Sequence, residues 1–425
     1  MRINLHSPGR KLVFALLCLG LATGFVYRAS SAYAVARALD STDPDVLEKA
    51  VRREPGDAEA WYRLGRVHAV LLQDIPGSVA PLRRAAALDA YHARYWLDLG
   101  LAYQYLGDSA AQRNAVDTAV RLDAHDPDIA WEAANFYLIA GDTEHALPMF
   151  RATLEGDPTA RHVSSALLLS LRATNNDFGQ VLDKVLSREP RFYIDLATLA
   201  VQFNRMDAAD LIWSRMIAMG VHVPVHLTNV YFNSLIEKND ATRARLAWND
   251  LAKIAPELTP YTYSDNLIVN GRFENNILND GFDWHYHHND AAPLEIDSTG
   301  AHGGSHSLMM TFTGQPVEDL GLRQIIPVQG MECYRFSGSM RTSELEGLSG
   351  PEFRLTDLKS GRLYAKLGTG SGTHGWEDSH SDFHTEAGTH FLRLDIVRER
   401  PLTALEGRAW ADDLSLERMA PEVCR

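Results

Sequence analysis

A basic stretch and then an apolar run occupy the first part of the chain. Arg2, Arg10 and Lys11 precede an apolar run from Leu12 to Tyr27, which only glycine and threonine interrupt. The run is shorter than the about 20 residues of a membrane-spanning helix, but the mostly small residues of 29–36 can extend it. The pattern predicts that residues 1–35 form an export segment, with the basic end left in the cytoplasm and the rest of the chain translocated.

The sequence leaves two fates open for this segment. Ala32-Tyr33-Ala34 has the form of a signal-peptidase site, but Arg28 lies between it and the apolar run, which disfavours cleavage. A retained signal-anchor is therefore the preferred interpretation, and a cleaved signal peptide is the alternative. We expect a cell-envelope protein with a single membrane pass, or a secreted or periplasmic protein if the segment is removed.

Tryptophans recur at a fixed interval after this segment. Trp61, Trp96 and Trp131 are spaced 35 residues apart, and the first two are followed by Leu64-Gly65 and Leu99-Gly100. Gly-Asp turns and Asp-Pro breakers separate the apolar stretches of each unit. A repeat of this length with helical spacing predicts stacked helix hairpins, an α-solenoid.

These residues resemble the tetratricopeptide repeat, in which the Trp, the Leu-Gly pair and a following Tyr pack one helix against the next. The resemblance covers residues 43–160, and apolar helices separated by polar turns continue to residue 256. We expect residues 36–256 to form about six hairpins after a half unit. The resemblance implies a concave face that binds a protein partner.

The pattern changes at Pro256, and residues 257–264 are expected to be a linker. Beyond it, apolar residues alternate with polar ones, as in Leu308, Met310 and Phe312. About ten short strands of this kind predict a two-sheet antiparallel β-sandwich over residues 265–425. The expected fold class is thus multidomain: a membrane helix, an α-solenoid and a β-sandwich.

Four stretches of this sandwich resemble the galactose-binding-like jelly rolls, a class that includes many carbohydrate-binding modules. They are residues 266–274, 304–308, 334–342 and 409–416, and they occur in the family's order. The resemblance implies a jelly roll, and a polysaccharide as one candidate partner, although members of such a fold have many functions.

Asp412 is the most informative carboxylate of the jelly roll. Strand alternation puts it on the face of Trp410, Leu414 and Leu416, toward the core, where a charge needs a partner. The resemblance implies that Glu274 and Asp412 are ligands of a calcium ion. The alternative is that Asp412 accepts backbone N–H groups of the first strand.

Three aromatic residues near predicted loops are candidates for stacking on sugar rings: Trp284, Tyr286 and Trp376. For Trp284, packing in the core is the favoured interpretation, because aromatic residues at strand ends usually close a sandwich. Cys333 and Cys424 are the only cysteines outside the apolar segment. In an oxidising compartment they can form one disulfide, and two unpaired thiols are the alternative.

Charge and motifs narrow the function. With 41 Lys and Arg against 55 Asp and Glu, the net charge of −14 disfavours nucleic acid as a partner. The sequence has no nucleophile elbow, phosphate loop or dinucleotide fingerprint, so we expect no enzyme. The leading hypothesis is a non-enzymatic envelope scaffold, which resembles the anchored repeat proteins of bacterial exopolysaccharide systems. The alternative is a glycan-binding module on a helical spacer.

Overall fold

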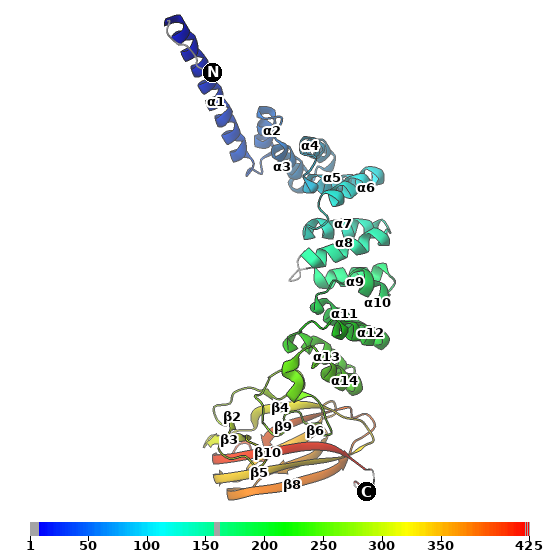
Figure 1. The fold of residues 1–425 in the computed structure, drawn as a ribbon, viewed down its shortest axis with the longest axis vertical. Coiled ribbons are helices and arrows are strands. Elements are labelled where there is room, and N and C mark those ends of the chain that lie inside the picture. The colour runs from blue at the N-terminus through cyan, green and yellow to red at the C-terminus, as the bar shows by residue number, and fades with distance from the viewer. Residues whose placement is uncertain (1–7, 157–161, 421, 423, 425) are drawn as a thin grey trace. The chain divides into compact units, whose positions relative to one another are not determined.

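The computed structural model describes residues 8–156, 162–420, 422 and 424 of the 425 residues (Figure 1). The chain folds as two compact units, Met1–Ser187 and Arg188–Arg425. The first unit is helical, and the second contains further helices and the β-sandwich. The predicted fold class is confirmed.

The apolar segment forms the long helix α1, Pro8–Ala38. Its stretch Lys11–Ala38 has a mean hydropathy of 1.9 in its most apolar window, and none of that window is buried in the protein. By length and composition it can cross a membrane; Arg2 lies outside the described residues. The last turns of α1 differ, because Val35 is buried in a cluster with Leu47 and Val51, and Ser31 Oγ accepts a hydrogen bond from Arg53 Nε (3.2 Å).

Helix hairpins succeed α1 in the first unit. An aspartate precedes most of these helices, and the carboxylates of Asp57, Asp108 and Asp126 accept N–H groups of the first turn, which stabilises a helix start. The helices are α2 Pro44–Arg53, α3 Ala58–Arg66, α4 Ile75–Leu88, α5 Ala93–Leu106, α6 Ser109–Leu122, α7 Pro127–Ile139, α8 Thr143–Gly156, α9 Val163–Ala173 and α10 Phe178–Lys184.

Two of the repeated tryptophans join a hairpin to the connection before it. The indole N–H groups of Trp61 and Trp96 donate to the carbonyls of Pro55 and Ala90, both at 3.0 Å. Their rings are half-buried rather than enclosed. For these two repeats the spacing therefore has a physical cause: Trp61 and Trp96 each tie their own helix to the preceding turn.

The first hairpin departs from the others. Helix α3 continues as a π-helical turn, η1 Val67–Leu71, and Gln73 has a positive φ of 52°. His68 Nδ1 lies 3.0 Å from Asp74 Oδ2, which joins the widened turn to the start of α4. Residues of η1 and of this turn, Ala69, Val70 and Gln73, line a hollow beside α5.

The second unit begins with two more hairpins, α11 Pro190–Gln202 with α12 Met206–Ala218, and α13 Asn229–Glu237 with α14 Ala241–Leu251. The 3₁₀ turn η2, Val225–Thr228, leads into α13. Asn204 and Asn239 take positive φ values in the turns, which asparagine tolerates better than most residues. Within the described residues the chain thus has the six hairpins that the sequence predicts.

The expected linker is structured. Residues Pro256–Tyr261 form the 3₁₀ turn η3, where Leu258 is fully buried. Trp248 Nε1–H donates to the carbonyl of Tyr261 at 2.7 Å, and the Trp248 ring meets Phe282 of the sandwich edge to face. Helix α14 and the sandwich therefore pack against each other through apolar side chains.

Two antiparallel five-stranded sheets make the sandwich (Figure 1, yellow to red). The first sheet has the order β1 His285–Tyr286, β4 Asp319–Pro327, β9 Phe391–Arg398, β6 Pro351–Asp357 and β7 Leu363–Gly368. The second has the order β2 Leu294–Asp297, β3 Ser307–Thr313, β10 Leu405–Met419, β5 Cys333–Gly347 and β8 Gly372–His384. The predicted alternation holds, since Leu308, Met310 and Phe312 all lie in the core between the sheets.

A β-bulge interrupts the last strand, and it corrects one prediction. Ala409 and Ala411 face the core, as do Leu414 and Leu416, although Leu414 follows Ala411 by an odd number of positions, where regular alternation would need an even one. The register shifts between Asp412 and Ser415, and Asp413 has a φ of 47°. One extra residue in a strand reverses the faces, so Asp412 lies on the outer face with Trp410, and its predicted direction toward the core was wrong.

Candidate functional site

The first unit has a hollow of about 470 Å³ beside α3, η1 and α5, which we call the repeat groove. It is lined by Arg66, Ala69, Val70, Gln73, Ile75, Leu82, Arg94, Asp98, Leu101, Ala102 and Tyr105. Val70 and Tyr105 are 60% and 75% exposed. Apolar side chains of this exposure at the rim of a hollow are typical of a surface that contacts another molecule.

Charged groups form the floor of the repeat groove. Buried Asp98 accepts a hydrogen bond from the Tyr62 hydroxyl (2.8 Å) and lies 3.0 Å from Arg94 Nε. Arg94 Nη1 also donates to Glu132 at 2.8 Å. Burial, and then the charge of Asp98, raise the pKa of Tyr62 to about 12. Arg66 is the least engaged cation, because its nearest carboxylate oxygen, on Asp98, is 3.8 Å away.

No groove residue was predicted, although the repeat contains the signal. Arg66 and Leu101 each lie five positions after a repeat tryptophan, and Val70 and Tyr105 lie nine positions after one. Because positions four apart share a helix face, these pairs line one continuous surface.

The second candidate site is the β2–β3 loop, residues 302–306, which two carboxylates hold; we call it the loop clasp. Glu274 Oε1 accepts from the backbone N–H groups of Ser305 (2.7 Å) and His306 (3.3 Å). Asp412 Oδ2 accepts from those of His302 (2.8 Å) and Gly303 (3.0 Å). Glu274 and Asp412 thus come together on one loop, as their motifs suggested, but through N–H donors.

This arrangement does not fit a calcium ion. Glu274 Oε2 lies 3.2 Å from His306 Nδ1, and Asp412 Oδ1 accepts from Asp413 N at 2.7 Å, so each oxygen of both carboxylates already has a nitrogen partner. In the parts of the chain that the structure describes, no three His, Cys, Asp or Glu side chains are grouped to hold a metal. Calcium binds oxygen ligands rather than N–H donors.

The alternative interpretation of Asp412 also needs one correction. Its backbone donors come from the β2–β3 loop and from Asp413, not from the first strand. Burial raises the pKa of Asp412 despite these bonds, whereas the N–H of Ser305 lowers the pKa of Glu274. A hydrogen bond to Asp413 raises the pKa of His302 at the start of the loop. The loop clasp is therefore a set of hydrogen bonds that fixes the conformation of the β2–β3 loop.

The three aromatic candidates for sugar stacking separate in the structure. Trp284 has no exposed surface and stacks on Phe273 in the core, so its favoured interpretation as a core residue is confirmed and its candidacy for sugar stacking was wrong. Tyr286 is half-buried against the core edge, where its hydroxyl accepts from Leu294 N. Trp376 is half-buried on the edge strand β8, and it alone of the three has a basic and aromatic surrounding on the outer face.

That surrounding spans three strands of the second sheet. The Trp376 ring centroid lies 5.4 Å from that of His302 and 5.7 Å from the Arg341 guanidinium. Arg341 in turn lies 4.1 Å above the ring of Trp410. We call these four side chains the Trp376 platform; sequence reasoning found only Trp376 of it, because cross-strand neighbours depend on the register.

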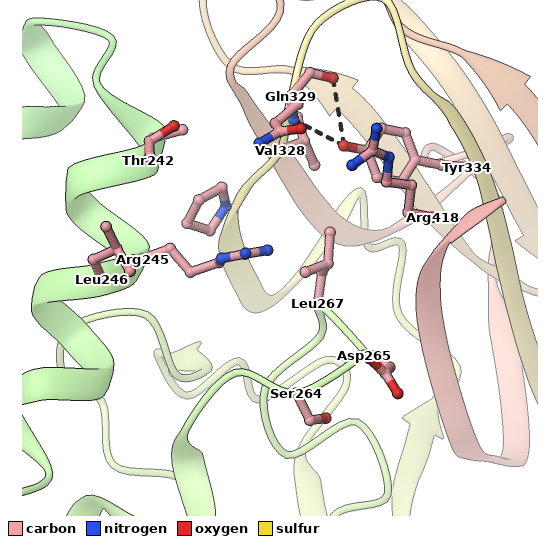
Figure 2. Close-up of a pocket in the computed structure, with 12 residues that line it drawn as sticks. Thr242, Arg245, Leu246, Ser264, Asp265, Leu267, Val328, Gln329, Tyr334 and Arg418 are labelled. Carbon is pink, nitrogen blue, oxygen red and sulfur yellow. Dashed lines mark hydrogen bonds between the residues drawn. The ribbon is translucent and has the colours of Figure 1, made fainter. Parts of the chain in front are cut away.

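Figure 2 shows a further cavity, of about 300 Å³, between α14 and the sandwich within the second unit. Helix α14 contributes Thr242, Arg245 and Leu246. The connection after η3 contributes Ser264, Asp265 and Leu267, and the sandwich contributes Pro327, Val328, Gln329, Tyr334 and Arg418. None of these residues was predicted, since they meet only when the helices pack on the sandwich.

The two cysteines outside α1 are joined. Cys333 at the start of β5 is disulfide-bonded to Cys424, and their Cα atoms are 5.8 Å apart. Of the two alternatives left by the sequence, the structure contains the bridge. It ties the C-terminal segment to the second sheet.

Comparison with known proteins identifies the repeats. A model of the tetratricopeptide repeat family matches residues 45–93 and 97–161. Superkiller complex protein 3 of Mus musculus is 28% identical over 179 residues, which are 40% of this chain and 10% of that protein. The chain therefore spans about a tenth of that relative. The first unit contains tetratricopeptide repeats.

Solved structures resemble each part separately. The tetratricopeptide repeat protein YrrB, whose structure is described as having an unusual peptide-binding site, has a TM-score of 0.31 at 12% identity, over 46% of this chain and 99% of its own. A crystal structure of MamA protein has a TM-score of 0.29 at 19% identity, over 36% and 91%. The carbohydrate-binding module CBM4 has a TM-score of 0.28 at 12% identity, over 36% and 99%.

Proposed function

We propose that this protein is a non-enzymatic scaffold of the cell envelope, held by α1 in a membrane, whose repeats bind a protein partner in the repeat groove. The observation that carries the proposal is the groove itself, where exposed Val70 and Tyr105 border a floor of paired charges. Repeat arrays use such faces for extended segments of other proteins. An apolar side chain of the partner would lie between the two rim residues, with a carbonyl or carboxylate toward Arg66.

A site-specific crosslink tests the groove. A photoreactive residue at position 70 or 105 of the full chain should form a discrete protein adduct in envelope extracts. Tyr105→Ala should weaken capture of the same partner about tenfold, since loss of an anchoring aromatic costs more than 1 kcal/mol. Tyr91→Ala is the matched control, because Tyr91 is 87% exposed and does not line the groove. Equal capture by both variants would refute the groove.

The location is tested separately. Proteolysis of intact spheroplasts should digest both units while a cytoplasmic marker stays whole, because basic residues before an apolar run favour export of the chain beyond it. Protection of the units would contradict the envelope assignment.

We further propose that the scaffold acts in exopolysaccharide or cell-envelope assembly. A strain without the protein should secrete less polysaccharide or have a defective envelope, and a strain that expresses Tyr105→Ala should share the defect. A deletion strain with normal polymer and envelope would contradict this role.

The Trp376 platform supports a second candidate, glycan binding by the jelly roll. An indole on the outer face beside Arg341 and His302 offers a stacking surface with polar neighbours. Titration of envelope polysaccharide fragments should change tryptophan fluorescence in the full chain and in Tyr286→Ala, but not in Trp376→Ala. No response across a broad panel would leave the jelly roll as a protein-contacting or structural module.

A further inference from the structure

The cavity of Figure 2 contains a cation with no partner. Arg418, on one side, donates from Nε to Glu332 at 2.9 Å and also pairs through Nη2, so its charge is balanced. Arg245 makes no hydrogen bond or ion pair to any residue that the structure describes. Asp265 lines the same cavity but does not pair with Arg245. Figure 2 shows the Arg245 side chain extending from α14 into the cavity toward Leu267, away from Asp265.

Further hydrogen-bonding groups around Arg245 are free. The side chains of Thr242, Ser264 and Gln329 line the cavity and have no hydrogen-bond partner among the described residues. The Tyr334 hydroxyl is already engaged, because it accepts from Gln329 N (2.8 Å) and donates to the Gln329 carbonyl (3.4 Å). Tyr334 therefore fixes the turn that carries Gln329, and leaves the Gln329 amide for another molecule.

The remaining walls are apolar. Leu267, Pro327 and Val328 are buried beside the hollow, and a volume of about 300 Å³ is at the lower end of the range for small-molecule sites. A guanidinium binds carboxylate or phosphate through two parallel hydrogen bonds. Hydroxyl and amide side chains at the rim suit the hydroxyl groups of a small polar body.

We propose that this cavity binds a small organic oxyanion, a carboxylate or a phosphate carried by a body of about one sugar ring, with the anionic group on Arg245. The site shares no residue with the repeat groove or the Trp376 platform, and it does not depend on the scaffold function.

Titration of the full chain in detergent with three probes tests the proposal. Glucuronate carries the carboxylate, glucose 6-phosphate carries the phosphate, and glucose is the neutral control. Calorimetry or ligand-observed NMR should show saturable binding of at least one anionic probe and none of glucose. Which anion binds identifies the source of the charge.

Variants of Arg245 decide whether that residue is responsible. Arg245→Gln should weaken binding at least about tenfold, and Arg245→Lys, which keeps the charge without the planar fork, should be intermediate. Arg408→Gln is the matched control, an exposed arginine on β10 outside the cavity. Because Arg245 is exposed and unpaired, its variants should melt as the wild type does. Binding that survives Arg245→Gln, equal binding of glucose, or no saturation up to about 10 mM would overturn the proposal.

Discussion

Asp283 is a carboxylate that the fold keeps away from water. It has no exposed surface; Oδ2 accepts from Leu278 N at 2.7 Å, while Oδ1 has no partner among the described residues. Burial raises its pKa to about 7. The native state therefore holds this proton more tightly than the unfolded chain, whose ordinary carboxyl has a pKa near 3.9.

We predict a pH dependence of stability that this residue causes. Its stabilising contribution is complete below about pH 4 and is lost as the pH rises through about 7, by roughly 2–4 kcal/mol in total. Asp283→Asn removes the titration, so the free energy of unfolding of the variant should fall less between pH 4 and pH 8. Denaturant unfolding at a series of pH values measures the difference. Asp265→Asn, at an exposed position, should leave the slope unchanged; parallel curves for wild type and Asp283→Asn would contradict the assignment.

Asp412 gives a prediction that also tests the calcium expectation. Three backbone N–H groups lose their acceptor in Asp412→Ala, and unpaired buried donors cost about 1–3 kcal/mol each when water cannot replace the partner. We expect a loss of about 2–4 kcal/mol and a mobile 302–306 loop. Chelator should leave the melting temperature of the wild type unchanged, because the clasp has no need of a cation.

The opposite response to a chelator would support the calcium site instead. If a chelator lowers the melting temperature of the wild type but not that of Asp412→Ala, binding of the ion to the folded state must be stabilising it. Gly304 explains why the clasp has little room to adjust: it has a φ of 72°, and a Cβ there would lie against Glu274 Oε1. Gly304→Ala should therefore destabilise the loop with or without chelator.

At the scale of the elements, Trp61 and Trp96 each join a helix to the turn before it. Trp96 is half-buried against the cluster of Tyr95, Leu99 and Leu82, and its indole N–H bonds to the Ala90 carbonyl. We predict that Trp96→Ala lowers the free energy of unfolding by about 2–3 kcal/mol, less than the about 3–5 kcal/mol of a fully buried aromatic. Thermal or denaturant unfolding with Tyr91→Ala as control checks this; a loss below about 1 kcal/mol would mean that the tie is unimportant.

Periodicity predicted the elements well and their fine register poorly. The six hairpins result from helical spacing and polar turns, and the strands result from alternation around Leu308 and Leu394. The bulge at Asp413 could not be predicted, because alternation assumes no extra residue and a positive φ at Asp413 has no local signature. That single residue decided whether Asp412 faced the core or the clasp loop.

The candidate sites, like the elements, could be predicted only in part. Motifs found Glu274 and Asp412, since each belongs to a recognisable stretch, whereas Trp376 was found only as an aromatic residue near a predicted loop. The same criterion selected Trp284, which is buried, because burial depends on the partner sheet. The sequence showed no sign of the cavity around Arg245, because its walls come from α14, the connection after η3 and the ends of strands β4, β5 and β10. Contacts so distant in sequence leave no spacing to detect.

At the scale of the molecule, helix α1 has two parts: an exposed apolar part and last turns that pack on the helical repeats. Its apolar part exposes Leu16, Leu17 and Leu21 at 58–75%, which in water would be a large apolar surface. Its last turns instead pack on the array through Val35, with Ser31 bonded to Arg53. The Ala32-Tyr33-Ala34 sequence thus lies within a continuous helix at the point where the helix meets the first repeats.

We therefore predict that the segment is retained. The mature protein should have the mass of the uncleaved chain and stay in the membrane fraction after alkaline carbonate washing. Cleavage after Ala34 would remove the Ser31–Arg53 hydrogen bond and leave Val35, which packs with Leu47 and Val51, at a free N-terminus, so we expect the array to be more stable with α1 attached. Leu17→Lys places a charge within the apolar part, at a cost of about 3 kcal/mol for insertion, and should lower the membrane-bound fraction, whereas Tyr33→Ala should not. A soluble form whose first residue is Val35 would show instead that the helix serves only for export.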